Sequence, residues 1–376
     1  MKISFIIKRK GRNMKTFIFV RNKKYRPSSY YRIYQYLEKD TNNDIELIEY
    51  ENDRFYNKKS RSKIINLLNI TFNSLIPGYI NRIYNIIKIL NKKEQYNVFI
   101  QRECFPKIVG PLGKNLLKRL ISNASKVYWD FDDNIFEAKE ITEFEEQLLK
   151  VYSNKIFVGN EYLQDKLNFS NKDKIIIVNT TDAMMERINL SNINHEREKT
   201  FTEQVILVWV GTKGNLKHLE NIIPELEEAA SKAKNKRIVL RIVSDGVLNQ
   251  PTKHLIIKNI KWERQVAFEE MLNAHIGLMP LIENEFTKGK CAFKAVQSIG
   301  CGLPVILSDV GMNKNVIEKR NGVLIKNDKG WTEAVIELST DIDAWKEKSN
   351  LSRELWLEKY NTEKNKKLLL NTLVQD

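Results

Sequence analysis

The sequence predicts an α/β protein made of two doubly wound domains that face each other across a cleft. Its 376 residues exceed what one ordinary hydrophobic core accommodates, so two domains are expected. Short β-branched or aromatic runs alternate with longer amphipathic patterns, which is typical of a parallel sheet covered by helices on both faces. This alternation stops near residue 186 and starts again at Val205. Two consecutive domains of the same architecture therefore follow from the pattern.

The first domain is predicted to span residues 1–182. Met14 begins a second plausible start, so residues 1–13 are expected to be an upstream extension. The expected strands are Thr16–Val20, Ile45–Tyr50, Asn97–Gln101, Lys126–Asp130, Lys155–Val158 and Lys174–Val178. The expected helices are Ser28–Glu38, Tyr79–Leu90, Pro106–Ile121 and Glu143–Tyr152.

A polar segment, residues 183–203, separates the two halves and shows no clear periodicity, so we expect it to be a linker or hinge. Residues 204–344 should form the second domain. Residues 345–376 have amphipathic patterns and are expected to pack across the domain junction as helices. The expected strands of the second domain are Val205–Val210, Arg237–Val243, Leu255–Ile260, Ile276–Met279, Pro304–Leu307 and Val323–Ile325, and its expected helices are Leu216–Ala233, Gln265–Asn273 and Phe293–Gly300.

The charge balance predicts a polyanionic partner. The chain has a formal net charge of +15, which suits nucleic acid, an anionic membrane surface or a phosphorylated small molecule. No signature of a known nucleic-acid-binding module accompanies the scattered lysines, so nucleic acid is not expected. A peripheral position at the inner face of a membrane stays open. Three cysteines and four histidines without metal-ligand spacing argue against a disulfide framework or a zinc site, and a cytoplasmic location is expected.

A glycine-containing loop opens the second domain. The strand Val205–Val210 runs into Gly211-Thr-Lys-Gly-Asn215 and then into a helix. Small residues at this place let an anionic ligand approach backbone N–H groups at a helix start. The loop lacks the spacing of a P-loop or of a dinucleotide-binding fingerprint, so a plain tight turn is an equal alternative.

The most specific pattern surrounds a second helix start. Lys290 precedes the expected helix and Lys294 lies in its first turn. The helix dipole favours anions there and disfavours a lysine unless an anion is bound. Gly302 ends this helix, Pro304 opens the next strand, and Gly311 follows that strand at the same edge of the sheet. These positions predict an anion-binding site at the carboxyl edge of the second sheet.

This region resembles the donor-binding part of the retaining GT-B glycosyltransferases, in particular the group-1 (GT4-like) family, over Val205 to Leu324. The similar pieces are Lys290, Lys294, Gln297, the turn Gly302-Leu-Pro304-Val-Ile, the run Ser308–Gly311, the loop Trp209–Asn215 and the turn Ile242–Gly246. The resemblance implies the GT-B fold, two Rossmann-like domains with the nucleotide-sugar donor in the second. It also implies an EC 2.4, hexosyltransferase-like activity in cell-surface polysaccharide or glycoconjugate synthesis, with a glycan or lipid-linked acceptor.

The resemblance also implies roles for single residues. Lys290 and Lys294 would contact the donor pyrophosphate and act in catalysis, and Gln297 would hold the ribose diol. The family usually has a glutamate at this last position and another eight residues earlier, where this chain has Gln297 and Gly289. The implied donor-binding residues are Gly211, Thr212, Lys213, Gly214, Asn215, Lys290, Lys294, Gln297, Gly311 and Asn313.

The acceptor side is expected in the first domain. Arg26-Pro-Ser-Ser-Tyr-Tyr-Arg32 follows the first strand and begins a helix that Ser28 or Ser29 caps. It is similar to a Pro-Ser-Ser-x-x-Arg stretch of related transferases, where the first loop borders the acceptor and the phosphates. An ordinary capped helix with exposed arginines is the alternative. The implied acceptor-side residues are Arg26, Ser28, Ser29 and Arg32.

Three carboxylates, Asp130, Asp132 and Asp133, follow a strand of the first domain. A GT-A metal site is one alternative, but a GT-A enzyme would not need the second doubly wound half. A haloacid-dehalogenase-like phosphatase needs Thr or Val where Asn134 stands, and the later acidic cluster of that class is not found. We assign the three carboxylates to acceptor binding or interdomain contacts, because the run resembles one in some group-1 enzymes; solvated or capping carboxylates remain the alternative.

The expected mechanism uses neither metal nor cofactor, because the nucleotide-sugar is a substrate. No histidine precedes residue 195, so the histidine base of many inverting GT-B enzymes is missing from the first domain, which favours retention. A non-catalytic sugar- or nucleotide-binding scaffold on the same fold is the alternative function. An epimerase or phosphorylase is a further alternative.

Overall fold

The computed structural model describes residues 14–38, 44–54, 62–105, 109–169, 172–233, 235–326 and 330–375. The proposed extension, residues 1–13, lies outside the described residues. The chain divides into two compact units. The first contains the described residues up to Phe131, together with Lys139–Phe157 and residues 172–176. The second contains Asp132–Ala138, residues 158–169 and everything described from Ile177 onward.

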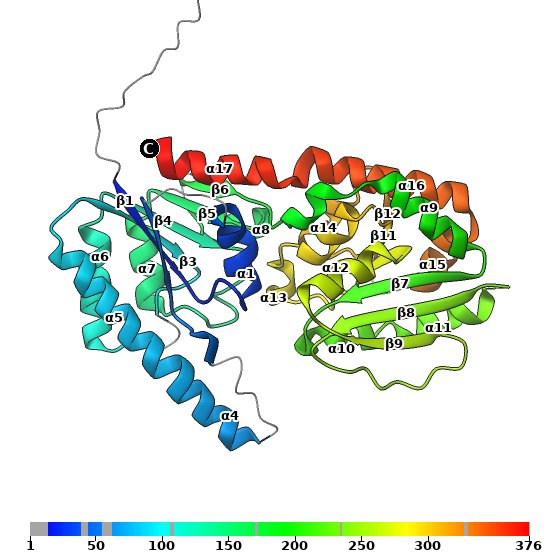
Figure 1. Ribbon diagram of the computed structural model, residues 1–376, viewed down its shortest axis with the longest axis horizontal. Helices are drawn as coiled ribbons and strands as arrows, with labels where there is room; N and C mark the ends of the chain where they lie inside the picture. Colours follow the sequence, from blue (N-terminus) through cyan, green and yellow to red (C-terminus); the bar gives the residue numbers. More distant parts are fainter. Residues whose placement is uncertain are drawn as a thin grey trace, which may run out of the picture. The chain divides into compact units, whose positions relative to one another are not determined.

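The first unit is built on a six-stranded sheet in the order β2-β1-β3-β4-β5-β6 (Figure 1). The strands β1 and β2, β1 and β3, and β3 and β4 pair in parallel. All six strands fall where the sequence predicts them, within one or two residues at each end. Their bounds are β1 Lys15–Val20, β2 Ile45–Glu49, β3 Tyr96–Gln101, β4 Lys126–Phe131, β5 Lys155–Val158 and β6 Ile175–Ile177.

A buried arginine ties the carboxyl ends of three strands together. Arg82 is fully buried and donates to the carbonyls of Val20 (2.6 Å), Ile48 (2.6 Å) and Cys104 (3.1 Å), which follow or end β1, β2 and β3. Burial lowers the pKa of this guanidinium. Because buried carbonyls without partners are costly, this one side chain stabilises the edge where the loops of the first unit begin.

The helices of the first unit include one long rod. The helix α4 (Lys63–Ile70) continues through the π-helical turn η2 (Thr71–Leu75) into α5 (Ile76–Asn91), and Figure 1 shows α4 projecting past the end of α5 in blue. The sequence predicts only Tyr79–Leu90 of this rod. The other helical segments are α1 Pro27–Ser29, η1 Tyr30–Tyr34, α2 Gln35–Leu37, α6 Pro111–Ser122, α7 Glu143–Tyr152 and η3 Lys172–Lys174.

The second unit is built on a six-stranded parallel sheet in the order β12-β11-β10-β7-β8-β9. All six strands again match the predicted ones within a residue or two. Their bounds are β7 Gln204–Val210, β8 Arg237–Ser244, β9 Ile256–Lys261, β10 Ile276–Met279, β11 Val305–Ser308 and β12 Gly322–Ile325.

Both faces of this second sheet are buried. Along β7, Ile206 and Val208 join a core cluster on one face, whereas Leu207 and Trp209 join a separate cluster on the other. Successive side chains of a strand point to opposite faces, so the two clusters show that helices cover both sides. The predicted doubly wound α/β class is therefore confirmed for both halves.

The helices of the second unit include one within the predicted linker. The segment 183–203 contains η4 (Ala183–Arg187) and α9 (Leu190–Phe201), although the sequence lacks clear periodicity there. Arg197 of α9 is buried and donates to four backbone carbonyls, so buried polar contacts replace the expected apolar face. The other helical segments are α8 Glu161–Lys166, η5 Lys213–Asn215, α10 Leu216–Glu220, α11 Ile223–Lys232, α12 Arg264–Leu272, α13 Glu285–Lys288, α14 Phe293–Gly300, η6 Gly311–Val316, α15 Trp331–Thr340, α16 Ile342–Leu355, η7 Trp356–Tyr360 and α17 Thr362–Gln375. None of the described helices is long and apolar enough to cross a bilayer.

Candidate functional site

The strand order of the second sheet marks a place where a ligand can bind. The chain runs outward from β7 through β8 to β9, and in the other direction from β10 through β11 to β12. Ligands of open parallel sheets bind outside the carboxyl ends of the strands, at the point where the order reverses. That point lies between β7 and β10, and both predicted donor loops leave these two strands.

The loop after β7 is held close to the sheet. A Cβ at Gly211 would lie 2.3 Å from the ring of Trp209, so only glycine fits, and its N–H donates to the carbonyl of Val243 at 3.1 Å. The N–H of Lys213 donates to the Asp245 carboxylate at 2.6 Å. The side chains of Thr212 and Lys213 are exposed beyond this anchored turn, as a ligand-binding loop requires.

The loop after β10 carries Lys290 and is fixed by two asparagines from distant parts of the chain. Asn160 donates to the carbonyls of Gly289 and Lys290, each at 3.1 Å. Asn134 donates to the carbonyl of Glu285 at 3.0 Å. The partly exposed side chain of Lys290 is left outside this scaffold, with its ammonium 4.9 Å from the ring centre of Phe286.

The same packing explains the glycine at position 289. A Cβ there would lie 2.6 Å from the Cβ of Asn134 and 3.2 Å from its backbone nitrogen. The first distance is shorter than real Cβ contacts and the second is tight, so a side chain here requires movement of the loop that carries Asn134. The glutamate that the family resemblance would place here is therefore excluded by the backbone of residues 132–138.

The start of α14 has the layout of an anion site. Ala292 precedes this helix in a left-handed conformation, with φ 50°, and no side chain caps the helix. Its first turn contains no acidic residue, and Lys294 lies there as predicted. The dipole and the lysine therefore both present positive charge at the carboxyl edge of the sheet.

Lys294 belongs to a relay of three side chains. Its ammonium donates to Oε1 of Gln297 at 3.0 Å, and Nε2 of Gln297 donates to the carboxylate of Asp182 at 2.7 Å. Both Gln297 and Asp182 are buried. The amide of Gln297 is therefore oriented by two partners, and its contacts connect the lysine to a buried carboxylate.

The charges of this relay shift one another's pKa. Burial lowers the pKa of Lys294 to about 8, and the nearby guanidinium of Arg264 lowers it further, whereas Asp182 and Cys291 oppose the change. Burial raises the pKa of Asp182, against hydrogen bonds from Met184 and Gln297 and the positive charge of Lys294. A bound anion beside Lys294 would restore the charged form that burial disfavours.

His218 is a neutral neighbour of the loop after β10. It is buried, and its Nδ1 accepts from the N–H of Ile282 at 3.1 Å. Burial lowers its pKa to about 4, and the positive charges of Lys290 and Lys217 act in the same direction. Because the imidazole is neutral near pH 7, it supplies a hydrogen-bonding group rather than a charge.

Two further predicted donor residues shape the neighbouring loop. Gly311 has φ +57°, and a Cβ there would lie 2.6 Å from the carbonyl oxygen of Lys288. Asn313 is buried and donates to the carbonyl of Ser308 at 2.9 Å. The hydroxyl of Ser308 in turn accepts from the N–H of Leu281 at 3.0 Å. Through these contacts, Gly311 and Asn313 help to hold the loops after β10 and β11 together.

The predicted acceptor-side residues are engaged with partners in the first unit. Arg26 forms two hydrogen bonds to the Glu51 carboxylate, at 2.7 and 2.6 Å. Ser29 is buried and donates to Gln101 at 3.1 Å. The hydroxyl of Ser28 accepts from Arg102 at 2.9 Å. Neither serine caps the helix by its side chain, since Arg26 occupies the N-cap position of α1.

Two residues predicted independently for the acceptor side bind each other. Arg32 and Asp130 are both buried, and Nε of the arginine lies 3.0 Å from each carboxylate oxygen. This buried pair neutralises both charges and fixes the end of β4 against η1. Asp132 is buried and Asp133 is partly buried, and both belong to the second unit.

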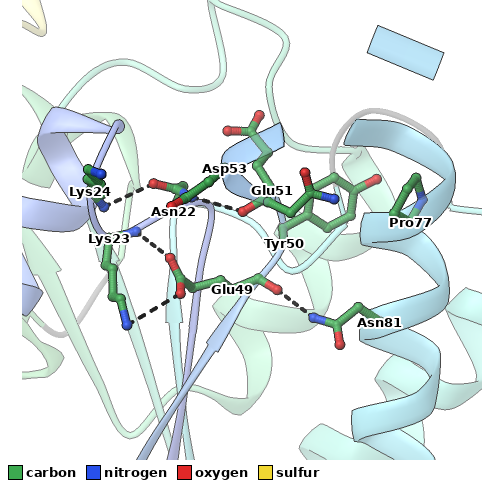
Figure 2. Close-up of a pocket in the computed structure, with 10 residues that line it drawn as sticks. Asn22, Lys23, Lys24, Glu49, Tyr50, Glu51, Asp53, Pro77 and Asn81 are labelled. Atoms are coloured by element: carbon green, nitrogen blue, oxygen red, sulfur yellow. Dashed lines mark hydrogen bonds and ion pairs between the residues drawn. The ribbon is translucent and has the colours of Figure 1, made fainter. Parts of the chain in front are cut away.

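A polar hollow of about 490 Å³ opens at the carboxyl ends of β1 and β2 (Figure 2). Asn22 organises it by donating to the carbonyl of Glu51 at 2.9 Å and to Asp53 at 3.3 Å. Glu49 accepts from the N–H of Lys23 at 2.8 Å. Its lining residues are Asn22, Lys23, Lys24, Glu49, Tyr50, Glu51, Asn52, Asp53, Pro77 and Asn81. Carboxylates and amides dominate, so the hollow suits a ligand rich in hydroxyl groups.

Sequence reasoning missed several of these residues. Asp182 ends the first half of the chain and Arg264 begins α12, and no local pattern connects either with Lys294. Asn134 and Asn160 resemble ordinary capping residues, and Asn160 does cap α8. Their positions directly after strands are the one signal that could have found them, because such positions lie at the ligand-binding edge. No group of three or more potential metal ligands is found among the residues that the structure covers.

A family model agrees with the second half of the chain. Residues 204–341 match the family described as "Glycosyl transferases group 1". This match confirms the resemblance predicted from the sequence. No curated protein matches the chain.

Solved structures agree with the whole architecture. Anabaena Alr3699/HepE in complex with UDP has a TM-score of 0.64 at 9% identity, over 96% of this chain and all of that one. Sucrose-phosphate synthase from Thermosynechococcus elongatus has a TM-score of 0.63 at 12% identity, over 96% and 98%. UDP-GlcNAc 2-epimerase from Neisseria meningitidis has a TM-score of 0.53 at 16% identity, over 96% and 100%. At these identities the likeness concerns the fold, and the predicted GT-B fold is confirmed.

Proposed function

We propose that this chain, whose residues 204–341 match the family of group-1 glycosyltransferases, transfers a sugar from a nucleotide-sugar donor to a glycan or lipid-linked acceptor. The observation that carries the proposal is the arrangement at the strand-order reversal of the second sheet. There the glycine loop after β7 and two lysines beside the uncapped start of α14 lie on the matched residues. The diphosphate of a nucleotide-sugar is an anion that suits the positive charge at this helix start.

The donor pyrophosphate is placed beside Lys294 and Lys290, with the loop Gly211–Asn215 close to the nucleotide. The Alr3699/HepE structures contain UDP or UDP-glucose, which makes UDP-glucose the first donor to test. Asp182 and Gln297 act here as positioning residues, because Gln297 accepts a hydrogen bond from the Lys294 ammonium and donates one to Asp182. This role differs from the ribose contact that the family resemblance implies for Gln297.

The chemical step is proposed to proceed with retention. The bond between the sugar C1 and the phosphate oxygen breaks first. The oxygen of the acceptor hydroxyl then bonds to C1 from the same face, and its proton passes to the departing diphosphate. The departing diphosphate gains negative charge, which the two lysines and the N-terminus of α14 stabilise. Loss of one such fixed donor typically costs about 3 kcal/mol in the transition state, or about a hundredfold in rate. No metal or cofactor enters the proposed step.

The acceptor is assigned to the first unit. The polar hollow at the carboxyl ends of β1 and β2 lies next to Arg26, which donates two hydrogen bonds to the lining residue Glu51. The hydroxyl groups of a glycan would exchange hydrogen bonds with Asn22 and Glu49 there. A place in cell-surface polysaccharide or glycoconjugate synthesis, on the cytoplasmic side of a membrane, is part of the proposal. So is closure of the two domains over the donor, which small-angle scattering with and without donor tests. Within the expected hinge, residues 183–203, helix α9 is anchored to the second unit by Arg197 and would move with that unit.

A non-catalytic binding scaffold is the second candidate. It is favoured by one observation, the glycine at position 289, where the loop carrying Asn134 leaves no room for a carboxylate. A scaffold would bind the nucleotide-sugar without turnover. Release of nucleoside diphosphate from UDP-glucose, with or without acceptor, therefore separates the two candidates.

The decisive experiment is a thermal-shift panel of UDP-, GDP-, ADP-, CDP- and dTDP-linked sugars on the whole chain. A ligand at 100 times its Kd should stabilise the fold by about 2.7 kcal/mol. Selective stabilisation by one nucleotide that is lost in Lys294→Ala supports the donor site. Lys288→Ala is the matched control, because the Lys288 ammonium points to Glu283 (3.4 Å) and Glu285 (3.2 Å) instead. Stabilisation that survives in Lys294→Ala, or that is equally lost in the control, would refute the site.

A further inference from the structure

The rod formed by α4, η2 and α5 has its polar and apolar faces reversed. The side that packs into the first unit carries the buried residues Asn69, Ser74, Gly78, Arg82, Ile86 and Ile89. Four of these six are polar or lack a side chain. A helix of a soluble domain normally places its apolar stripe on the buried side. Arg82 is buried and donates to three backbone carbonyls of the first unit, so specific hydrogen bonds fix which side of the rod faces that unit.

The opposite side of the same rod is a continuous apolar stripe. Its members follow one another at intervals of four residues and of three at the end, and each is between 40% and 73% exposed. They are Ile64, Leu68, Phe72, Ile76, Ile80, Tyr84 and Ile87. Ile65, Leu67, Ile70 and Leu75 extend the apolar surface beside the stripe. Single exposed apolar residues need no explanation, but a stripe of this length marks a surface that something covers.

The charge of this region points to an anionic partner. Between Ser62 and Lys93 the sequence contains five lysines or arginines and no aspartate or glutamate. Lys88, Lys92 and Lys93 are exposed at the end of the rod. The helix α6, which packs against α5, also lacks acidic residues and exposes Lys114, Lys118 and Arg119. Arg82 is buried, Lys88 and Lys92 lie near Glu46 of β2, and exposed Glu94 follows Lys93, so the excess of cations is local to the rod and to α6. A large apolar stripe accompanied by an excess of cations is typical of helices that lie in the interface of an anionic bilayer.

The length of the rod agrees with a flat surface better than with a protein groove. The rod has 29 residues from Lys63 to Asn91, which corresponds to about 43 Å of helix. The apolar stripe runs along almost all of it. We propose that α4, η2 and α5 dock this chain on an anionic lipid bilayer, with the stripe in the headgroup region and the cations against the lipid phosphates.

This docking would place the polar hollow of the first unit near the bilayer. Pro77 and Asn81 of α5 line that hollow, and Ile76 and Ile80 beside them belong to the outward stripe. A headgroup-linked sugar acceptor could then enter the hollow without leaving the membrane. The docking inference does not depend on the proposed transferase activity, and its test uses a separate readout.

The test is co-sedimentation of the full chain with vesicles of phosphatidylcholine alone or mixed with phosphatidylglycerol. We expect binding to the anionic vesicles only, weakened by high salt. The triple variant Phe72→Ser/Ile80→Ser/Tyr84→Ser should lose roughly tenfold in affinity for each side chain removed. The triple variant Lys88→Ala/Lys92→Ala/Lys93→Ala should lose roughly fivefold for each charge.

The matched control is Val151→Ser/Val247→Ser/Leu357→Ser, which removes three equally exposed apolar side chains elsewhere. It should bind vesicles as the parent does, and circular dichroism should show all variants folded. Absence of binding to anionic vesicles, or an equal loss in the control, would overturn the proposal. A dimer in solution that the stripe variant dissociates would also overturn it, in favour of a second copy as the occupant. Binding of UDP-glucose, measured on the same variants without vesicles, should stay unchanged.

Discussion

Replacing Lys294 by alanine should remove both donor affinity and its dependence on pH. The structure lowers the pKa of this lysine from the ordinary 10.5 to about 8, which corresponds to a cost of about 3 kcal/mol for the buried charge. A bound pyrophosphate that restores the ordinary pKa returns the same free energy as affinity. Lys294→Ala should therefore weaken donor binding by about a hundredfold at neutral pH.

The sign of the pH dependence follows from the same shift. Binding raises the pKa of Lys294, so the complex takes up a proton once the free protein has lost it. The affinity should be constant below about pH 8 and fall by about tenfold per pH unit above it. Calorimetric titration with UDP-glucose between pH 6.5 and 10 measures this, because the diphosphate of a nucleotide-sugar does not itself titrate in that range.

Three proteins complete the measurement. In the parent chain, donor affinity should begin to fall near pH 8, which appears as a bend in the plot of affinity against pH. Lys294→Ala should bind the donor weakly at every pH, and Lys288→Ala should show the same pH dependence as the parent. A parent profile that stays flat to pH 10 would refute the proposed contact between this lysine and the donor. So would a bend near pH 8 that persists in Lys294→Ala, because another group would then be responsible.

Three further outcomes are expected. Asp182→Asn should shift the pH at which donor affinity begins to fall to a lower value, since it removes a negative charge that favours the protonated Lys294. An unchanged pH would show that Asp182 does not influence the pKa of Lys294. Gly289→Ala should lower the free energy of unfolding in urea by about 1–3 kcal/mol, because its Cβ would lie 2.6 Å from that of Asn134. Gly214→Ala, whose Cβ would lie in open space, should change this free energy little, and equal effects of the two variants would contradict the packing argument. Arg82→Met should lower the same free energy by about 3 kcal/mol, since the carbonyls of Ile48 and Cys104 lose the Arg82 donor and that of Val20 keeps the N–H of Tyr50. A change below about 1 kcal/mol would show that other groups replace the guanidinium.

The strands and the loops that follow them could be predicted because their signals are local. A short run of β-branched residues such as Val205–Val210 is buried on both faces in any doubly wound sheet, so its composition alone identifies it. The helix start that contains Lys294 was recognisable for a similar reason, because a lysine in a first turn conflicts with the helix dipole.

The helix α4 was missed for an equally local reason. Its apolar residues point away from the domain, and Pro77 followed by Gly78 resembles a helix boundary in the sequence. In the structure Pro77 instead lies inside the continuous rod, directly after the π-helical turn η2, in which the N–H of Ile76 donates to the carbonyl of Thr71. A local π-helical turn lets a helix continue past a proline that cannot donate. Helix α9 was missed because its buried side is polar and is stabilised by hydrogen bonds from Arg197.

The sequence by itself determined the two doubly wound domains, the positions of their strands, and the lysines and glycines of the candidate donor site, because each depends on neighbours within a few residues. Tertiary structure alone decided which side chains meet. Gln297 contacts Asp182 across 115 positions, Arg32 pairs with Asp130 across 98, and Asn134 reaches the loop of Glu285 across 151. Such contacts depend on the crossovers that bring the carboxyl ends of different strands to one edge, and no local pattern of residues encodes them.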